Sequence, residues 1–318
     1  MPLTLEQYAA SLDTREDLHW PVAPPMQPAK ARPHLVRMPL VRVVAWDLYG
    51  TLLHLLSGDL LFQHPQKFVM DIALDKTVQE FKMWGSMSRK PGQPSEYMGQ
   101  IYEKVLTEQR LVSSPGERYP ELRAERIWEA IIKKLQQKEY KFDAGLYGPL
   151  PEYSRKIAYF FHASLQGTAC PEGTAGVLEQ LSARGIKQGL LADAQSFSLV
   201  QLQRGLAAQH SSMGLNLLFD PALRALSYDV GGRKPSERLF RHLLTGLGNL
   251  GFAPPQVLHV GTSIPKDLAP AKKLGMRTAL YVGDKDALEA TPEQLKDPAS
   301  KPDLLVTDLA QLLDVVGA

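Results

Sequence analysis

The chain has almost no cysteine and no strong excess of either charge. Cys170 is the one cysteine among 318 residues, so an internal disulfide and a metal site built from cysteines are excluded. The formal net charge of +2 at pH 7 gives no indication of a nucleic acid or an anionic membrane as partner. Every apolar run is too short or too interrupted by charge to span a bilayer.

The first residues, MPLTLEQYAASLDTRED, lack the basic start and the apolar stretch of a secretory signal. We therefore expect a cytoplasmic protein that acts on a small-molecule substrate and binds neither nucleic acid nor membrane. Whether the chain forms a homodimer through its apolar helices is left undecided, because composition gives no test of it.

Proline dominates the stretch HWPVAPPMQPAKARPHLVRMP. At this density it excludes a helix and a central strand, so we expect an extended N-terminal arm over residues 1–40, lying on the surface. A short amphipathic helix is expected within it, around residues 3–12.

The rest of the chain combines an alternating α/β pattern with one purely helical stretch. Buried strands are expected at 41–46, 186–193, 215–220, 256–263, 277–284 and 303–308, with helices between the later ones. This alternation predicts a mostly parallel, Rossmann-like sheet covered by helices on both faces. Helical spacing over 68–84, 97–112, 121–137 and 153–165 predicts an inserted helical domain. We therefore expect a core of residues 41–53 and 166–318, a helical insertion of residues 54–165, and most of the insertion's aromatic residues in its own core.

The run VRVVAWDLYGTLL places Asp47 at the carboxyl end of the first strand, where open α/β sheets bind ligands. Two interpretations are open from these residues. Asp47 is a nucleophile, or it is an acid that caps a following helix.

Four ordered motifs, WDLYGTLL, LLAD, GGRKPSERLF and HVGTSIPKDLAPAKKLGM, resemble those of the haloacid dehalogenase superfamily, whose Rossmann-like core carries a helical cap. The resemblance implies that Asp47 attacks the substrate and forms a covalent aspartyl intermediate, which water hydrolyses. It also implies that Lys234 neutralises the nucleophile, that Thr51 orients it, and that Asp267 orients or activates the water.

Two departures separate the chain from the phosphatases of that superfamily. Tyr49 stands where they have a second Asp that acts as general acid, and Thr262 stands where they have an Asp that binds magnesium. The DLYGTL pattern resembles instead the 2-haloacid dehalogenase branch, which needs no metal. We therefore expect no cofactor, and we expect substrate contacts from Tyr49, Thr51, Asp193 and Thr262.

The match to that branch is incomplete. Ala192 and Asp193 replace a Ser-Asn pair that holds the substrate carboxylate, Ile264 replaces an Asn, and Phe240 replaces a Tyr. A substrate-binding Arg in the cap is not identified. Arg89 and Arg110 are candidates by location alone.

Three hypotheses follow. The first is a hydrolase that acts through Asp47 on the carbon–halogen bond of a small 2-haloacid. The second is a phosphomonoester phosphatase with an altered Mg²⁺ site, built from Asp47, Asp193 and Asp267. The third is a non-catalytic binding module, for which the changes at Ala192, Thr262 and Ile264 are the reason.

Overall fold

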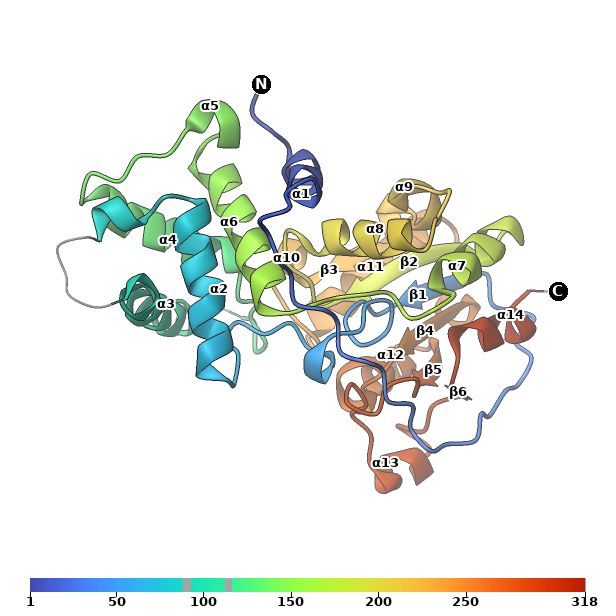
Figure 1. The fold of residues 1–318 in the computed structure, drawn as a ribbon. Coiled ribbons are helices and arrows are strands. Elements are labelled where there is room, and N and C mark those ends of the chain that lie inside the picture. Colours follow the sequence, from blue (N-terminus) through green and yellow to red (C-terminus); the bar gives the residue numbers. More distant parts are fainter. Residues whose placement is uncertain (88–92, 112–115, 318) are drawn as a thin grey trace.

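The core is a single parallel sheet. The computed structural model describes residues 1–87, 93–111 and 116–317. Its six strands lie in the order β3-β2-β1-β4-β5-β6 (Figure 1), and every neighbouring pair is parallel. Their bounds are β1 Val43–Trp46, β2 Lys187–Ala192, β3 Arg224–Leu226, β4 Val257–Gly261, β5 Arg277–Tyr281 and β6 Leu304–Val306.

Helices cover both faces of the sheet. Along β1, Val44 and Trp46 pack in one hydrophobic cluster with α7, α8 and α14, whereas Val43 and Ala45 pack in another with α11 and α12. This alternation follows from the period of two along a strand, and the predicted fold class is confirmed. The core helices are α7 Thr174–Ala183, α8 Ser198–Ala208, α9 Leu215–Leu218, α10 Ser227–Val230, α11 Glu237–Asn249, α12 Ala269–Lys273, α13 Pro292–Lys296 and α14 Leu312–Val315.

One predicted strand is wrong. Residues 215–220 contain the short helix α9, and the sheet's edge strand β3 begins later, at Arg224. The run LNLLFD is apolar, but it is too short for the spacing of its apolar residues to distinguish a strand from a helix. In the structure Leu218 is buried while Leu217 is 72% exposed, so the run is not buried along its length.

The stretch between β1 and α7 forms a helical bundle with a hydrophobic core of its own. Its main helices are α2 Lys67–Glu80, α3 Pro94–Arg110, α4 Ala124–Gln136 and α6 Leu150–Leu165. The short helix α5, Ala144–Tyr147, lies between α4 and α6. Most of the aromatic residues that we expected in this core are buried there, namely Tyr102, Trp128, Tyr159 and Phe160, whereas Trp84 is partly exposed. The bundle lies beside the sheet in Figure 1.

The N-terminal arm joins the bundle to the far edge of the sheet. Its helix α1, Leu5–Asp13, buries Tyr8 and Leu12 in the bundle core, and Arg204 of α8 donates a hydrogen bond to the carbonyl oxygen of Ala9 at 2.8 Å. Farther along, His34 exchanges backbone hydrogen bonds with Leu305 of β6. In Figure 1 the dark blue trace follows this route. Most residues of the arm are exposed or half-buried, and the arm also pairs with the edge strand.

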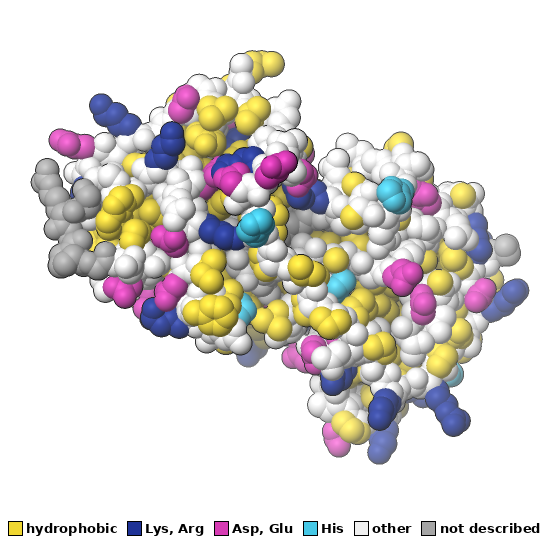
Figure 2. Space-filling view, in the orientation of Figure 1, with side chains coloured by type: hydrophobic (Ala, Val, Ile, Leu, Met, Phe, Trp, Pro, Cys, Tyr) yellow, Lys and Arg dark blue, Asp and Glu magenta, His cyan; other side chains and the backbone are white. Residues whose placement is uncertain are grey.

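The surface drawn in Figure 2 carries Lys, Arg, Asp and Glu side chains intermingled, in agreement with the near-zero net charge. Within residues 1–87, 93–111 and 116–317, no helix combines the length and the apolar character that crossing a membrane requires.

Candidate active site

The site lies at the carboxyl ends of the central strands. Asp47 follows β1, Asp193 follows β2 and Thr262 follows β4, and because these strands are parallel their ends meet at one edge of the sheet. The chain proceeds from β1 to β2 on one side and returns to β4 on the other, so this edge is the topological switch point where such sheets bind ligands.

A tight turn directs the chain away from Asp47. Gly50 has φ of +82°, a left-handed conformation that favours glycine, and its N–H donates to the carbonyl oxygen of Leu53 at 2.7 Å. A Cβ at Gly50 would lie 3.2 Å from Oγ1 of Thr262. Glycine at residue 50 therefore allows the turn after Asp47 to approach Thr262, which follows β4.

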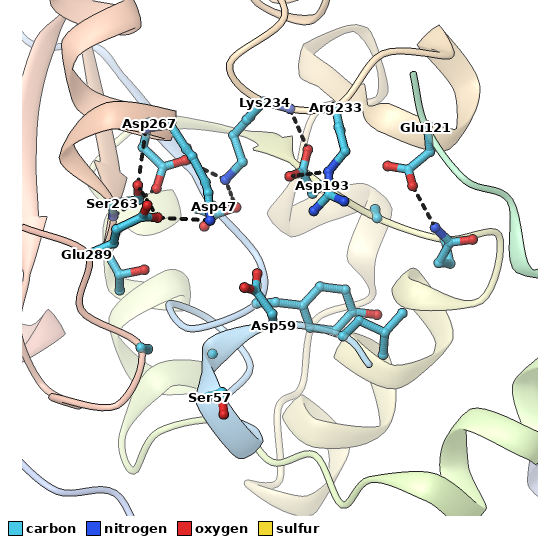
Figure 3. Close-up of a pocket in the computed structure, with 18 of the residues that line it drawn as sticks. Asp47, Ser57, Asp59, Glu121, Asp193, Arg233, Lys234, Ser263, Asp267 and Glu289 are labelled. Atoms are coloured by element: carbon cyan, nitrogen blue, oxygen red, sulfur yellow. Dashed lines mark hydrogen bonds and ion pairs between the residues drawn. The ribbon is translucent and has the colours of Figure 1, made fainter. Parts of the chain in front are cut away.

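Two carboxylates share one ammonium group. Lys234 Nζ lies 2.5 Å from Oδ1 of Asp47 and is also paired with Oδ1 of Asp267 (Figure 3). All three side chains are at most 7% exposed. The structure therefore brings together three residues that are far apart in the sequence and that we had named as the catalytic set.

Asp267 is fixed from several directions. Its Oδ2 accepts a hydrogen bond from the N–H of Ser263 at 3.0 Å, and Nε2 of the buried His259 lies 3.8 Å from its Oδ1. A Cβ at Gly261 would lie 2.8 Å from Oδ2 of Asp267, so the glycine at the end of β4 makes room for this carboxylate.

The buried charges shift one another's protonation. Burial raises the pKa of Asp47 to about 8, with the charge of Asp267 adding to the effect and Lys234 opposing it. Burial alone would raise the pKa of Asp267, but Lys234 and His259 hold it well below its usual range. Burial alone would lower the pKa of Lys234, yet its carboxylate partners raise it. Lys234 therefore stays charged, Asp267 stays ionised, and Asp47 is the member that titrates near neutral pH.

A cavity of about 100 Å³ opens onto Asp47. Its walls come from the sheet edge and from the helical bundle, and its bundle side includes Asp59, Phe62 and Glu121. The core side contributes the ion-paired set of Asp47, Lys234 and Asp267. It also contributes Asp193, Arg233, Thr262 and Lys266.

Asp193 and Arg233 form the second charged pair at the cavity. Asp193 accepts a hydrogen bond from the backbone N–H of Lys234 at 2.7 Å, and its other oxygen lies 3.6 Å from Nε of Arg233. Sequence reasoning missed Arg233, although it directly precedes the motif lysine. It also missed Glu121, whose pKa burial and the charge of Asp193 raise to about 7.

Other predicted site residues lie differently. Tyr49 lines the cavity, but its hydroxyl is hydrogen-bonded to Ser198 Oγ at 2.7 Å and to Gln201 Oε1 at 2.6 Å. Thr51 does not make the expected hydrogen bond to Asp47: it is fully buried, away from the cavity, and its hydroxyl has no partner among the described residues.

Two further positions from the sequence analysis do not line the cavity. Ile264 packs in a small apolar cluster with Leu268, and Arg110 is exposed at the end of α3. Arg89 lies outside the described residues.

These donors do not fit a magnesium ion. Mg²⁺ needs several oxygen ligands free to surround it. Here Lys234 is paired with Oδ1 of Asp47 and Oδ1 of Asp267, while Asp193 accepts a hydrogen bond from the backbone N–H of Lys234 and is paired with Arg233. In the parts of the chain that the structure describes, no three His, Cys, Asp or Glu side chains are grouped to hold a metal.

Comparison with known proteins gives a consistent family. A family model described as HAD-hydrolase-like matches residues 232–312, which include Lys234 and Asp267. Phosphoserine phosphatase from Thermus thermophilus is 31% identical over 194 residues, covering 61% of this chain and 68% of that protein. Glyceraldehyde 3-phosphate phosphatase from Methanocaldococcus jannaschii is 26% identical over 143 residues, or 45% of this chain and 54% of that protein, so the chain spans about half the length of this relative.

The fold is also found among solved structures. A 2-haloacid dehalogenase from Pseudomonas syringae pv. Tomato superposes with a TM-score of 0.52 at 18% identity, and the match covers 86% of this chain and 97% of the other. At this identity the likeness concerns the fold alone.

Proposed function

The chain belongs to the haloacid dehalogenase superfamily of hydrolases, and on that premise we propose that it cleaves its substrate through a covalent intermediate on Asp47. The observation that carries this proposal is the buried Asp47 carboxylate at the cavity, 2.5 Å from the ammonium of Lys234. A carboxylate in this position can attack without first being deprotonated once the pH exceeds its pKa. The helical bundle, which supplies one wall of the cavity, then acts as the cap.

The bond that fits the site best is the carbon–halogen bond of a small 2-haloacid. An Asp47 oxygen bonds to the carbon, the halide leaves with the bonding electrons, and water then cleaves the ester to give the hydroxy acid, a proton and free Asp47. Halide leaves without being protonated. This matters because Tyr49, at the general-acid position, has its hydroxyl engaged with Ser198 and Gln201.

Arg233 supplies the cation that a haloacid carboxylate needs. Its guanidinium faces the cavity with 45% of the side chain exposed, and its 3.6 Å contact with Asp193 leaves N–H groups for a substrate. Asp193 is itself paired, so its repulsion of a substrate carboxylate is smaller than for an unpaired buried anion. Asp267 and Thr262 both line the cavity with Asp47, which supports a role for them in orienting the hydrolytic water. With its low pKa, Asp267 is suited to orient that water rather than to deprotonate it.

Phosphomonoester hydrolysis is the second candidate, because both curated relatives are named as phosphatases. Members of the superfamily with that activity typically use Mg²⁺, and the donors around Lys234 would have to rearrange to bind it.

The test is a panel of 2-haloacids and phosphomonoesters, each assayed with Mg²⁺ and with a chelator, for the natural chain and Asp47→Asn. We expect halide release that survives the chelator and disappears in Asp47→Asn. Phosphate release that the chelator abolishes would favour the second candidate. Turnover of neither panel, with no change in Asp47→Asn, would favour a non-catalytic binding module.

A further inference from the structure

A short segment of the bundle is bonded directly to core loops at the cavity. The N–H of Arg233 donates to the carbonyl oxygen of Tyr119 at 2.8 Å, and the N–H of Glu121 donates to that of Gly231 at 3.2 Å. Figure 3 shows Glu121 reaching the cavity from this segment. Residues 117–125, which we name the docking segment, therefore connect the proposed cap to the loops around Lys234.

One buried core side chain makes three hydrogen bonds to the docking segment. Gln195, two residues after Asp193, accepts from the N–H of Ala124 at 2.8 Å through Oε1. Its Nε2 donates to Glu121 Oε1 at 3.1 Å and to the carbonyl oxygen of Leu122 at 2.9 Å. Gln195 is only 3% exposed, and the amide uses both its donors and its acceptor on the same segment.

The same residue is linked to the nucleophile's turn. The Tyr49 hydroxyl donates to Gln201 Oε1, so the Ser198 hydroxyl donates to the Tyr49 oxygen. Ser198 Oγ in turn accepts from the N–H of Gln195 at 2.7 Å. A continuous set of buried hydrogen bonds therefore runs from the residue two beyond Asp47 to the docking segment.

We propose that Gln195 is a positioning residue that holds the cap over Asp47, with Glu121 as its charged partner; the link to catalysis rests on the function proposed above. An amide is required at residue 195 because the position faces a carboxylate and a carbonyl oxygen, which need donors, and an N–H, which needs an acceptor. Burial raises the pKa of Glu121 to about 7, so the test is made at about pH 8, where Glu121 is ionised. A carboxylate at residue 195 would then confront Glu121 at hydrogen-bonding distance, and like charges there oppose docking.

The test is a double-mutant cycle of Gln195→Glu and Glu121→Gln. Gln195→Glu should speed amide hydrogen exchange in residues 119–125 by about tenfold or more and lower kcat/KM about tenfold, mainly through KM. In the Glu121→Gln background the same change should cost clearly less, because an amide again faces a carboxylate. The rescue is only partial, since the carbonyl oxygen of Leu122 still lacks the donor that Gln195 supplies. Gln203→Glu, which adds the same charge at an exposed position of α8, is the matched control and should change neither readout.

Amide hydrogen exchange is measured without substrate, so the docking role of Gln195 and the proposed function can fail separately. If no form turns over any substrate but the exchange cycle behaves as expected, the proposed function fails and the docking role stands. Unchanged exchange in Gln195→Glu, or a loss that Glu121→Gln does not reduce, overturns the docking role. Equal acceleration along the whole chain would also overturn it, because that is the pattern of a general loss of stability.

Discussion

Replacing Lys234 with methionine tests the shared ammonium group at the centre of the site. Methionine has a similar volume, so the change removes the charge and leaves Asp47 and Asp267 facing each other without a counterion. Lys234 is 5% exposed, and its partners are 7% and 1% exposed. Removing one partner of a buried ion pair costs about 3–5 kcal/mol. We expect a loss of that size in the free energy of unfolding, measured by urea denaturation at about pH 8.

The cost should depend on pH in a defined direction. Burial raises the pKa of Asp47 to about 8 in the native chain, and losing the ammonium raises it further. A group whose pKa is higher in the folded state than in the unfolded state stabilises the fold at low pH. This contribution is lost as the pH rises from the unfolded-state pKa to the folded-state pKa. In Lys234→Met this window extends to higher pH, whereas in the native chain it closes near pH 8. Below about pH 8 both chains therefore lose stability in parallel, and the extra cost of the substitution grows only as the pH rises above about 8.

Two comparisons make the prediction specific. Lys187→Met breaks an ion pair with Asp220 whose lysine is 55% exposed, and such surface pairs contribute about 0–1 kcal/mol. Asp267→Asn combined with Lys234→Met leaves one unpaired carboxylate instead of two, so the loss should shrink by about 1 kcal/mol or more. If Lys234→Met cost no more than Lys187→Met at every pH, the shared ammonium would not stabilise the fold as argued.

Three further outcomes are expected. Initial rates should rise about tenfold per pH unit up to about pH 8, because Asp47 attacks only when it is ionised. In Asp267→Asn the midpoint of this pH–rate profile should move to lower pH. A midpoint near the ordinary pKa of Asp in both chains would contradict the burial argument. Arg233→Met should raise KM for 2-haloacids about tenfold but change the free energy of unfolding by less than about 1 kcal/mol, and an unchanged KM would remove Arg233 from the substrate site. Tyr49→Phe should cost about 1–3 kcal/mol of stability, because it leaves buried hydrogen-bonding groups unpaired; a variant as stable as the native chain in urea denaturation would contradict this.

The sequence was sufficient for those parts of the molecule whose signal is local. Strands β1, β2, β4 and β5 are long apolar runs followed by turn residues, and Asp47, Asp193 and Thr262 follow directly from lying at the ends of parallel strands. The run LNLLFD misled because four to six apolar residues fit either a strand or a buried helix turn.

The residues that the sequence could not supply come together through packing. Glu121 lies in the loop before α4, and only the docking of that loop against Gln195 brings it to the cavity. Arg233 has a sequence signal in its neighbour Lys234, but its contact with Asp193 depends on how the loop before α11 crosses the end of β2. Thr51 shows the opposite case: the motif predicted a contact with Asp47, but its hydroxyl is buried without a partner among the described residues.

The central claim, covalent attack by Asp47 on a carbon centre, is tested most directly by repeated turnover in water enriched in heavy oxygen. Hydrolysis of an aspartyl ester at its carbonyl carbon transfers the water oxygen to the Asp47 carboxylate, and the next turnover passes it to the product. Mass spectrometry of the peptide that contains Asp47 should therefore detect the label in that residue. Label in the product from the first turnover, with none in Asp47, would contradict the account.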